Sequence, residues 1–162
     1  MVRYRRKMVL KNLKNSFPSK SSHELLTIER EFYKNLCDYA VETLKLLTIT
    51  RKDLEKRMAF KNMALIEDFY KRNQSILFLA SHQFNWEWLL TTACFRFPMQ
   101  IDFIYQPLSS RLFNDFSLAC RTRFGGYAIK RDEVAREMIK RKDILRGIAS
   151  VADQYPGYGH DK

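Results

Sequence analysis

A histidine and a glutamate, five positions apart after a short apolar run, could together deprotonate a hydroxyl group. His82 follows the run Ser75-Ile-Leu-Phe-Leu-Ala-Ser, and Glu87 comes after an Asn-Trp pair. An imidazole held by one carboxylate is the smallest set of side chains that can accept a hydroxyl proton near neutral pH. The alternative for His82 is a structural role at the end of a strand.

The elements around this pair limit how the two side chains can meet. Residues 74–80 are short, apolar and uncharged, which predicts a buried strand, and residues 84–96 have helical spacing without Pro or Gly. Five positions on one helix correspond to about 500° of rotation, so residues at that spacing do not share a face. A direct contact between His82 and Glu87 therefore requires that His82 lies before the helix and folds back onto it.

The rest of the chain predicts one α/β domain over residues 1–162. A basic helix at 3–15 is followed by a capping box, Ser21 to Glu24, that starts a long helix. We expect the buried face of that helix to consist of Leu25, Ile28, Phe32, Leu36, Tyr39, Thr43 and Leu47. Short helices at 50–58 and 63–72 precede an alternation of strands at 75–80, 100–105, 127–130 and 147–152 with helices at 84–96, 109–123 and 132–142. This order predicts a mostly parallel sheet with flanking helices and a helical N-terminal layer.

Composition narrows the class of protein. The chain has 162 residues, 46% of them hydrophobic, which excludes a disordered polypeptide. Its net charge is +11, and residues 1–20 contain seven Lys or Arg and no acid. Such a segment suits an anionic partner such as phospholipid head groups, nucleic acid or an acidic carrier protein, although it could also be a solvated basic helix face.

The cysteine spacing argues against a metal-binding protein, and the lack of long apolar runs argues against a membrane-spanning one. Cys37, Cys94 and Cys120 are far apart and form no metal-binding pattern, so we expect reduced thiols and no metal site. No run approaches the roughly 20 apolar residues of a membrane span. We expect a chain that lies on a membrane without crossing it.

Several short blocks, in this order, resemble one known family. They are Arg5-Arg6, Lys11-Asn-Leu-Lys-Asn-Ser-Phe-Pro18, Glu42-Thr-Leu-Lys45, His82-Gln-Phe-Asn-Trp-Glu87, Tyr105-Gln-Pro-Leu108, Arg121-Thr-Arg-Phe-Gly125 and Ala152-Asp-Gln-Tyr-Pro156. Together they are similar to the late acyltransferases of lipid A biosynthesis, the lauroyl/myristoyl transferase family, in a Bacteroidetes-like version. Each block alone is weak, but the ordered set is specific and covers nearly the whole chain.

The resemblance implies an enzyme at the cytoplasmic face of the inner membrane of a Gram-negative cell. It would move a fatty acyl group from acyl carrier protein, or from acyl-CoA, to a hydroxyl group of a lipid A precursor, without a metal or other cofactor. The family's His-x4-Asp/Glu motif matches His82 and Glu87 as the catalytic pair. The implied partners are the carrier protein, the lipid A precursor and the anionic membrane surface, and not nucleic acid.

Two departures from the family pattern shape our expectation of the domain. The usual hydrophobic anchor before the first block and the portion after the Asp-Gln element do not match any residues of this sequence. We therefore expect an incomplete acyltransferase-like domain with residues 1–20 as a basic, membrane-proximal segment.

The remaining site residues each have two interpretations. Asn85 and Trp86 could contact the substrate or shape the turn before the helix. Arg121 and Arg123 suit phosphate oxygens, or they complement the end of a helix dipole. The Asp-Gln element matches Asp153 and Gln154; Asp153 could orient one of these arginines or be an ordinary loop acid.

Two other functions compete with this hypothesis. A glycerophospholipid acyltransferase shares the His-x4-acid chemistry, but this sequence lacks a Phe-Pro-Glu-Gly-type element. A non-catalytic basic module that binds anionic membranes or nucleic acid is supported by the charge alone, since no phosphate loop or RNA-binding signature is present.

Overall fold

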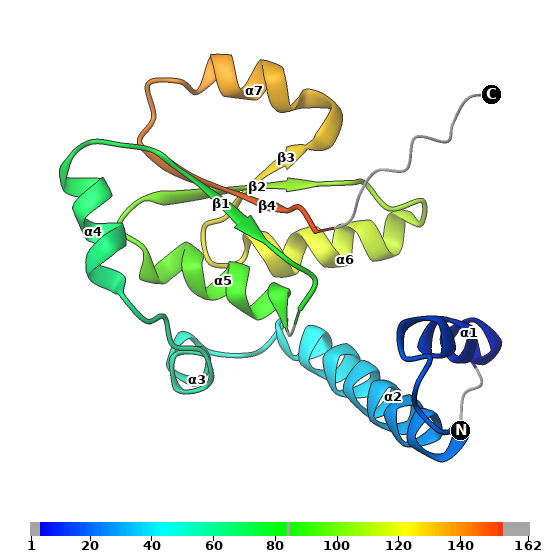
Figure 1. Cartoon of the computed structure of the whole chain (residues 1–162). Coiled ribbons are helices and arrows are strands. Elements are labelled where there is room, and N and C mark those ends of the chain that lie inside the picture. The colour runs from blue at the N-terminus through cyan, green and yellow to red at the C-terminus, as the bar shows by residue number, and fades with distance from the viewer. Residues whose placement is uncertain (1–3, 84, 154–162) are drawn as a thin grey trace. The chain divides into compact units, whose positions relative to one another are not determined.

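The computed structural model describes residues 4–83 and 85–153 (Figure 1). The chain divides into two compact units, Met1–Leu44 and Lys45–Lys162. The prediction of a single domain over residues 1–162 stays a prediction.

The first unit contains helix α1 (Arg6–Ser16) and most of helix α2 (Ser22–Lys45). The expected capping box forms, because the Glu24 carboxylate accepts hydrogen bonds from both the backbone N–H and the hydroxyl of Ser21 at 2.8 Å. Arg6 joins the two helices by donating to Glu29 at 2.8 Å. The Glu29 side chain is only 4% exposed, so this ion pair satisfies a carboxylate that is removed from water.

The predicted buried face of α2 is wrong over much of its length. Leu25 is buried as expected, but Phe32 and Leu36 are exposed, and Leu47, which is also exposed, lies beyond the end of α2. The physical reason is one of length, since α2 has 24 residues and the other described helix of its unit, α1, has only 11. An apolar stripe at helical spacing shows which face could be buried, but burial also requires a partner of matching length.

The second unit is built on a four-stranded sheet. Its strands are β1 (Ile76–Ala80), β2 (Gln100–Tyr105), β3 (Tyr127–Lys130) and β4 (Arg146–Val151), in the spatial order β1-β4-β2-β3. Every pairing is parallel. The α/β prediction is therefore confirmed, and the strand bounds agree with those expected to within one residue.

Helices cover the two faces of this sheet (Figure 1). One face carries three helices, α4 (Met63–Lys71), α5 (Trp86–Arg96) and α6 (Arg111–Thr122). The other face carries α7 (Val134–Lys140), which follows a short 3-10 turn (Arg131–Glu133). Between α5 and the sheet, Ala93, Met99 and Ile101 form one apolar core. A second core joins α5 to α3 (Arg51–Arg57) and α6 through Leu54, Trp88 and Cys120.

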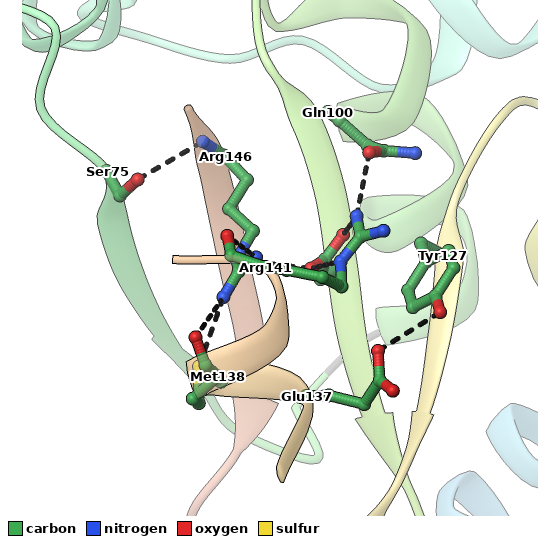
Figure 2. Close-up of polar contacts among 8 residues, drawn as sticks. Ser75, Gln100, Tyr127, Glu137, Met138, Arg141 and Arg146 are labelled. Atoms are coloured by element: carbon green, nitrogen blue, oxygen red, sulfur yellow. Dashed lines mark hydrogen bonds and ion pairs between the residues drawn. The ribbon is translucent and has the colours of Figure 1, made fainter. Parts of the chain in front are cut away.

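The amino ends of the central strands are joined by a buried ionic network (Figure 2). The Asp102 carboxylate, which is fully buried, accepts hydrogen bonds from Arg141 at 3.0 and 3.1 Å and lies 3.3 Å from Nε of Arg146. Arg141 also donates to the Gln100 side chain at 2.8 Å, and its guanidinium group stacks 3.7 Å from the centre of the Tyr127 ring. These contacts join β2, β3, β4 and the end of α7 at this end of the sheet.

The carboxyl ends of the strands lie at the opposite edge. Ligands of open parallel sheets bind beyond this edge, because the loops between the strands and the following helices lie there and can carry functional side chains. His82 follows β1 and Asp153 follows β4, so both belong to this edge.

Candidate active site

Pairing between two neighbouring strands brings His82 to Asp153. The β1–β4 ladder ends at the pair Ala80–Val151, and the backbone N–H of Ala152 then donates to the Ala80 carbonyl at 2.9 Å. Asp153 comes directly after Ala152 on one chain segment, and His82 comes two residues after Ala80 on the other. The two side chains come from positions 71 residues apart, and only the parallel pairing of their strands makes them neighbours.

The Asp153 carboxylate contacts His82 twice. One oxygen lies 2.8 Å from Nδ1 of the imidazole, and the other accepts the backbone N–H of His82 at 2.9 Å. The backbone N–H bond, together with the bond to the ring, lowers the pKa of Asp153 below its usual range. An ionised carboxylate only accepts hydrogen bonds, so Nδ1 of a neutral imidazole must carry the proton, and Nε2 has the free lone pair.

The first residues of α5 pack beside the His82 ring. Asn85 is buried at the N-cap position, where its side-chain oxygen accepts the backbone N–H of Trp88 at 3.0 Å. This contact caps α5, which is the turn-shaping role among the two interpretations of Asn85, and contact with substrate stays a prediction. Trp86, the first residue of α5, stands edge-to-face against the imidazole of His82, with ring centroids 4.9 Å apart. The ring of His82 is therefore held between a carboxylate and an aromatic side chain.

Glu87 has a different partner. Its carboxylate accepts hydrogen bonds from Nε and Nη2 of Arg121 at 2.8 and 2.5 Å, in a two-pronged arrangement. The Glu87 side chain is 6% exposed and that of Arg121 is 22% exposed. This ion pair links the first turn of α5 to the last turn of α6 and neutralises a carboxylate in the interior.

The structure thus exchanges the partners that the sequence suggested. Within residues 4–83 and 85–153, no hydrogen bond or ion pair joins His82 to Glu87. His82 does lie before the helix, as a contact required, but its ring is held by Asp153, while Arg121 holds Glu87. Asp153 also does not orient an arginine, which was one of its two interpretations. Burial explains the exchange, since a buried glutamate needs the full charge of an arginine rather than a neutral imidazole.

The other predicted binding residues are accounted for in part. Arg123 donates to the backbone carbonyls of Leu46 and Ile49 at 2.8 and 2.5 Å, so it fastens the segment after α2 to the end of α6. Gln154 lies outside the described residues. The contacts described for Arg121 and Arg123 are with other parts of the protein, and binding of phosphate by either arginine stays a prediction.

An open pocket of about 580 Å³ lies at the same edge of the sheet. It is bordered by Tyr105 at the end of β2, Lys130 at the end of β3, and Arg111 and Asn114 in the first turns of α6. The sequence did not predict this pocket. The signal available was the carboxyl-edge rule itself, because the loops after β2 and β3 end at that edge.

The thiols of this unit are poor nucleophiles. Burial raises the pKa of Cys94 to about 12, and burial together with the Glu87 carboxylate raises the pKa of Cys120. A thiol that stays protonated at neutral pH neither attacks an acyl group nor binds a metal ion readily. In the part of the chain that the structure describes, no three His, Cys, Asp or Glu side chains come together as a metal site.

The geometry around His82 suits proton transfer from a hydroxyl group. Nδ1 is held by a carboxylate, the ring is fixed by Trp86, and about a third of the His82 side chain is exposed to solvent. A base of this kind increases the nucleophilicity of an alcohol that attacks an acyl carbon. The N-terminus of α5, which carries the positive end of the helix dipole, begins beside His82 at Trp86.

Comparison with known protein families agrees with this chemistry. None of the helices in the described residues has the length and apolarity to cross a bilayer. A comparison with curated proteins found no match to the sequence. The model of the family described as bacterial lipid A biosynthesis acyltransferase matches residues 1–158. The chain therefore belongs to this family of enzymes, which transfer an acyl group in lipid A biosynthesis.

Proposed function

We propose that this chain transfers a fatty acyl group from an acyl carrier protein, or from acyl-CoA, to a hydroxyl group on an acyl chain of a lipid A precursor, with His82 as the general base. The observation that carries the proposal is the exposed imidazole of His82 at the carboxyl edge of the sheet, with one ring nitrogen 2.8 Å from a carboxylate. Both donors present the acyl group as a thioester on the same phosphopantetheine arm, so one site can accept either.

The proposed reaction begins when Nε2 of His82 takes the proton of the acceptor hydroxyl. The hydroxyl oxygen bonds to the thioester carbonyl carbon, and the carbonyl oxygen becomes an oxyanion near the N-terminus of α5. The carbon–sulfur bond then breaks, and the imidazolium returns the proton to the leaving thiolate. The products are an ester on the acceptor and the free thiol of the donor, and the enzyme ends in its starting state.

The function is tested with the purified chain, an acyl-carrier protein thioester and a lipid A precursor with a free acyl-chain hydroxyl. Mass spectrometry should detect an acceptor that has gained one acyl group, and His82→Ala should reduce the rate by about 10²–10⁴-fold, the range of general-base assistance. His23→Ala is the matched control, because His23 is an exposed histidine in the first turn of α2. Acyl-CoA is tested in parallel as the donor.

Two results would contradict the proposal. One is the absence of acyl transfer by the wild-type chain, and the other is equal activity of the wild-type and His82→Ala proteins. Transfer to glycerol 3-phosphate in place of the lipid A precursor would instead favour a glycerophospholipid acyltransferase.

The proposal includes a membrane surface as a partner, on the cytoplasmic side of the inner membrane where the precursor resides. The outward face of α1 carries the exposed lysines Lys7, Lys11 and Lys14, and Met8 is exposed beside them. Tyr4 and Phe17, at the two ends of the helix, are also exposed. An exposed surface that combines lysines with large apolar side chains fits the boundary between anionic head groups and acyl chains.

Vesicle binding tests this surface. Each lysine near an anionic bilayer contributes about 1 kcal/mol, so replacing Lys7, Lys11 and Lys14 by Gln should weaken binding to phosphatidylglycerol-containing vesicles about 100-fold. Replacing the exposed Lys52, Lys56 and Lys61 removes the same charge elsewhere and is the control. Equal loss of binding in both triple variants would mean that net charge alone, rather than α1, determines the attraction.

A further inference from the structure

The two carboxylates near His82 have environments that suit different tasks. We infer that Asp153, rather than the motif carboxylate Glu87, is the positioning residue for the His82 base, and that Glu87 supports the site only through Arg121. The inference rests on the proposed function for its catalytic meaning, but the geometric part stands on the contacts themselves.

The first argument is the geometry of Asp153. Its two oxygens bind two groups of a single residue, the ring nitrogen Nδ1 and the backbone N–H of His82, at 2.8 and 2.9 Å. The hydrogen bond to the backbone fixes the position of the His82 main chain, and the contact with Nδ1 fixes the orientation of its ring. Together they leave the imidazole little freedom to rotate, which is what a base needs if its lone pair is to meet the substrate.

The second argument is the electrostatics of Asp153. The same hydrogen bonds that orient the histidine keep the pKa of Asp153 low. The carboxylate is therefore ionised at neutral pH and can hold only the tautomer with a proton on Nδ1. It also stabilises the imidazolium that forms when Nε2 accepts a proton.

The third argument is that Glu87 is already engaged. Both of its oxygens accept from the Arg121 guanidinium, at 2.8 and 2.5 Å, and the side chain is 6% exposed. To reach the imidazole, the buried Glu87 carboxylate would have to give up both hydrogen bonds from the Arg121 guanidinium, which is unfavourable for a charge removed from water. The pair instead holds the N-terminal turn of α5, and with it Trp86, in place beside His82.

The tautomer of His82 tests the inference without any substrate. Long-range ¹H–¹⁵N NMR spectra of the labelled chain at alkaline pH distinguish a protonated from an unprotonated ring nitrogen in neutral imidazole. The chain has three histidines, so the His82 signals are identified as those missing from His82→Gln. We expect a proton on Nδ1 in the wild type, and its transfer to Nε2 as the main form in Asp153→Ala.

Substitutions of the two carboxylates separate their roles. Asp153→Asn should reduce kcat about 10²–10⁴-fold with little change in KM, since an amide can donate as well as accept and no longer selects one tautomer. Glu87→Gln should leave the His82 tautomer as in the wild type, even if activity falls because α5 is loosened. Asp143→Asn, at an exposed position before β4, is the matched control and should retain both the tautomer and kcat.

The outcomes are distinguishable from those of the proposed function. A proton on Nε2 in the wild type, or a tautomer that changes in Glu87→Gln and not in Asp153→Ala, would overturn the inference even if acyl transfer depends on His82. Conversely, a wild-type chain with the expected tautomer but without acyl transfer would overturn the proposed function and leave the orienting role of Asp153 intact.

Discussion

The two edges of the parallel sheet use the same kinds of side chain for opposite purposes. At the amino edge, Asp102 is fully buried and lies within hydrogen-bond or ion-pair distance of Arg141 and Arg146. At the carboxyl edge, Asp153 is 36% exposed and holds one imidazole. Burial makes the first carboxylate a structural element, while exposure leaves the histidine bound by the second accessible to a substrate.

Glu87 lies near the carboxyl edge, like Asp153, but it resembles Asp102 in burial. It is adjacent to the site in sequence, but it is almost as buried as Asp102 and is held by an arginine in the same way. A carboxylate that is permanently paired with an arginine is poorly suited to stabilise a histidine as it gains and loses a proton. The degree of burial thus separates orienting carboxylates from structural ones better than their distance along the chain.

The largest expected effect on stability is at the amino edge. Asp102→Asn leaves two guanidinium groups in the interior without a counter-charge, so we expect a loss of about 3–5 kcal/mol in the free energy of unfolding. Urea denaturation measures it, with Asp143→Asn expected to stay within about 0.5 kcal/mol of the wild type. A loss below about 1 kcal/mol would mean that solvent reaches this network.

A smaller loss is expected for Glu87→Gln. The Arg121 side chain retains some access to water, so we expect the free energy of unfolding to fall by about 2–3 kcal/mol, below the full range for a buried pair. The same denaturation experiment checks it. Stability equal to that of the wild type would place Glu87 with Asp153 as a carboxylate that is free to serve the chemistry.

For Asp153→Asn we expect almost no effect on stability. The pair with His82 is more than one-third exposed on both sides, and ion pairs of this kind contribute about 0–1 kcal/mol. The denaturation midpoint should therefore stay close to that of the wild type while activity falls as described above. If the protein lost as much stability as Glu87→Gln, a structural role would explain the loss of activity, and the comparison of the two edges would fail.

The smallest effect is expected for an exposed carboxylate that caps a helix. Hydrogen bonds from Ser21 lower the pKa of Glu24 to about 2, so its stabilising contribution is complete above its ordinary value of 4.5 and is lost as the pH falls toward 2. The stability difference between the wild type and Glu24→Gln should therefore shrink over this pH interval. Circular dichroism during denaturation at several pH values checks this, and a constant difference would contradict the assigned cap.

Much of the local structure could be predicted from the sequence because it depends on near neighbours. Alternating apolar runs and helical spacing predicted every strand of the sheet, and the Ser21–Glu24 pattern predicted the start of α2. The position of His82 after the 75–80 strand is a local property too. The predicted burial of that strand is wrong, since β1 lies at the edge of the sheet and Leu77 and Leu79 are exposed. The family resemblance likewise depends on short blocks in a fixed order, and the family match over residues 1–158 confirms it.

The extent of burial was less predictable. The exposed Phe32 and Leu36 have the spacing of a core stripe, yet nothing local to α2 shows how long its partner is. Likewise, the sequence does not indicate that Glu87 is removed from water and Arg121 is beside it, 34 residues away. Burial is a property of what packs against a residue, and it determines whether a charge must be permanently paired.

The amino-acid sequence by itself therefore determined the order of the elements, the location of His82 at a strand end, and the candidates for its partner. Only the tertiary structure decided between those candidates. Asp153 reaches His82 because β4 pairs with β1 in a parallel register that extends through the Ala152–Ala80 hydrogen bond. That register depends on the packing of the whole sheet, and no pattern within five or even fifty residues of the histidine contains it.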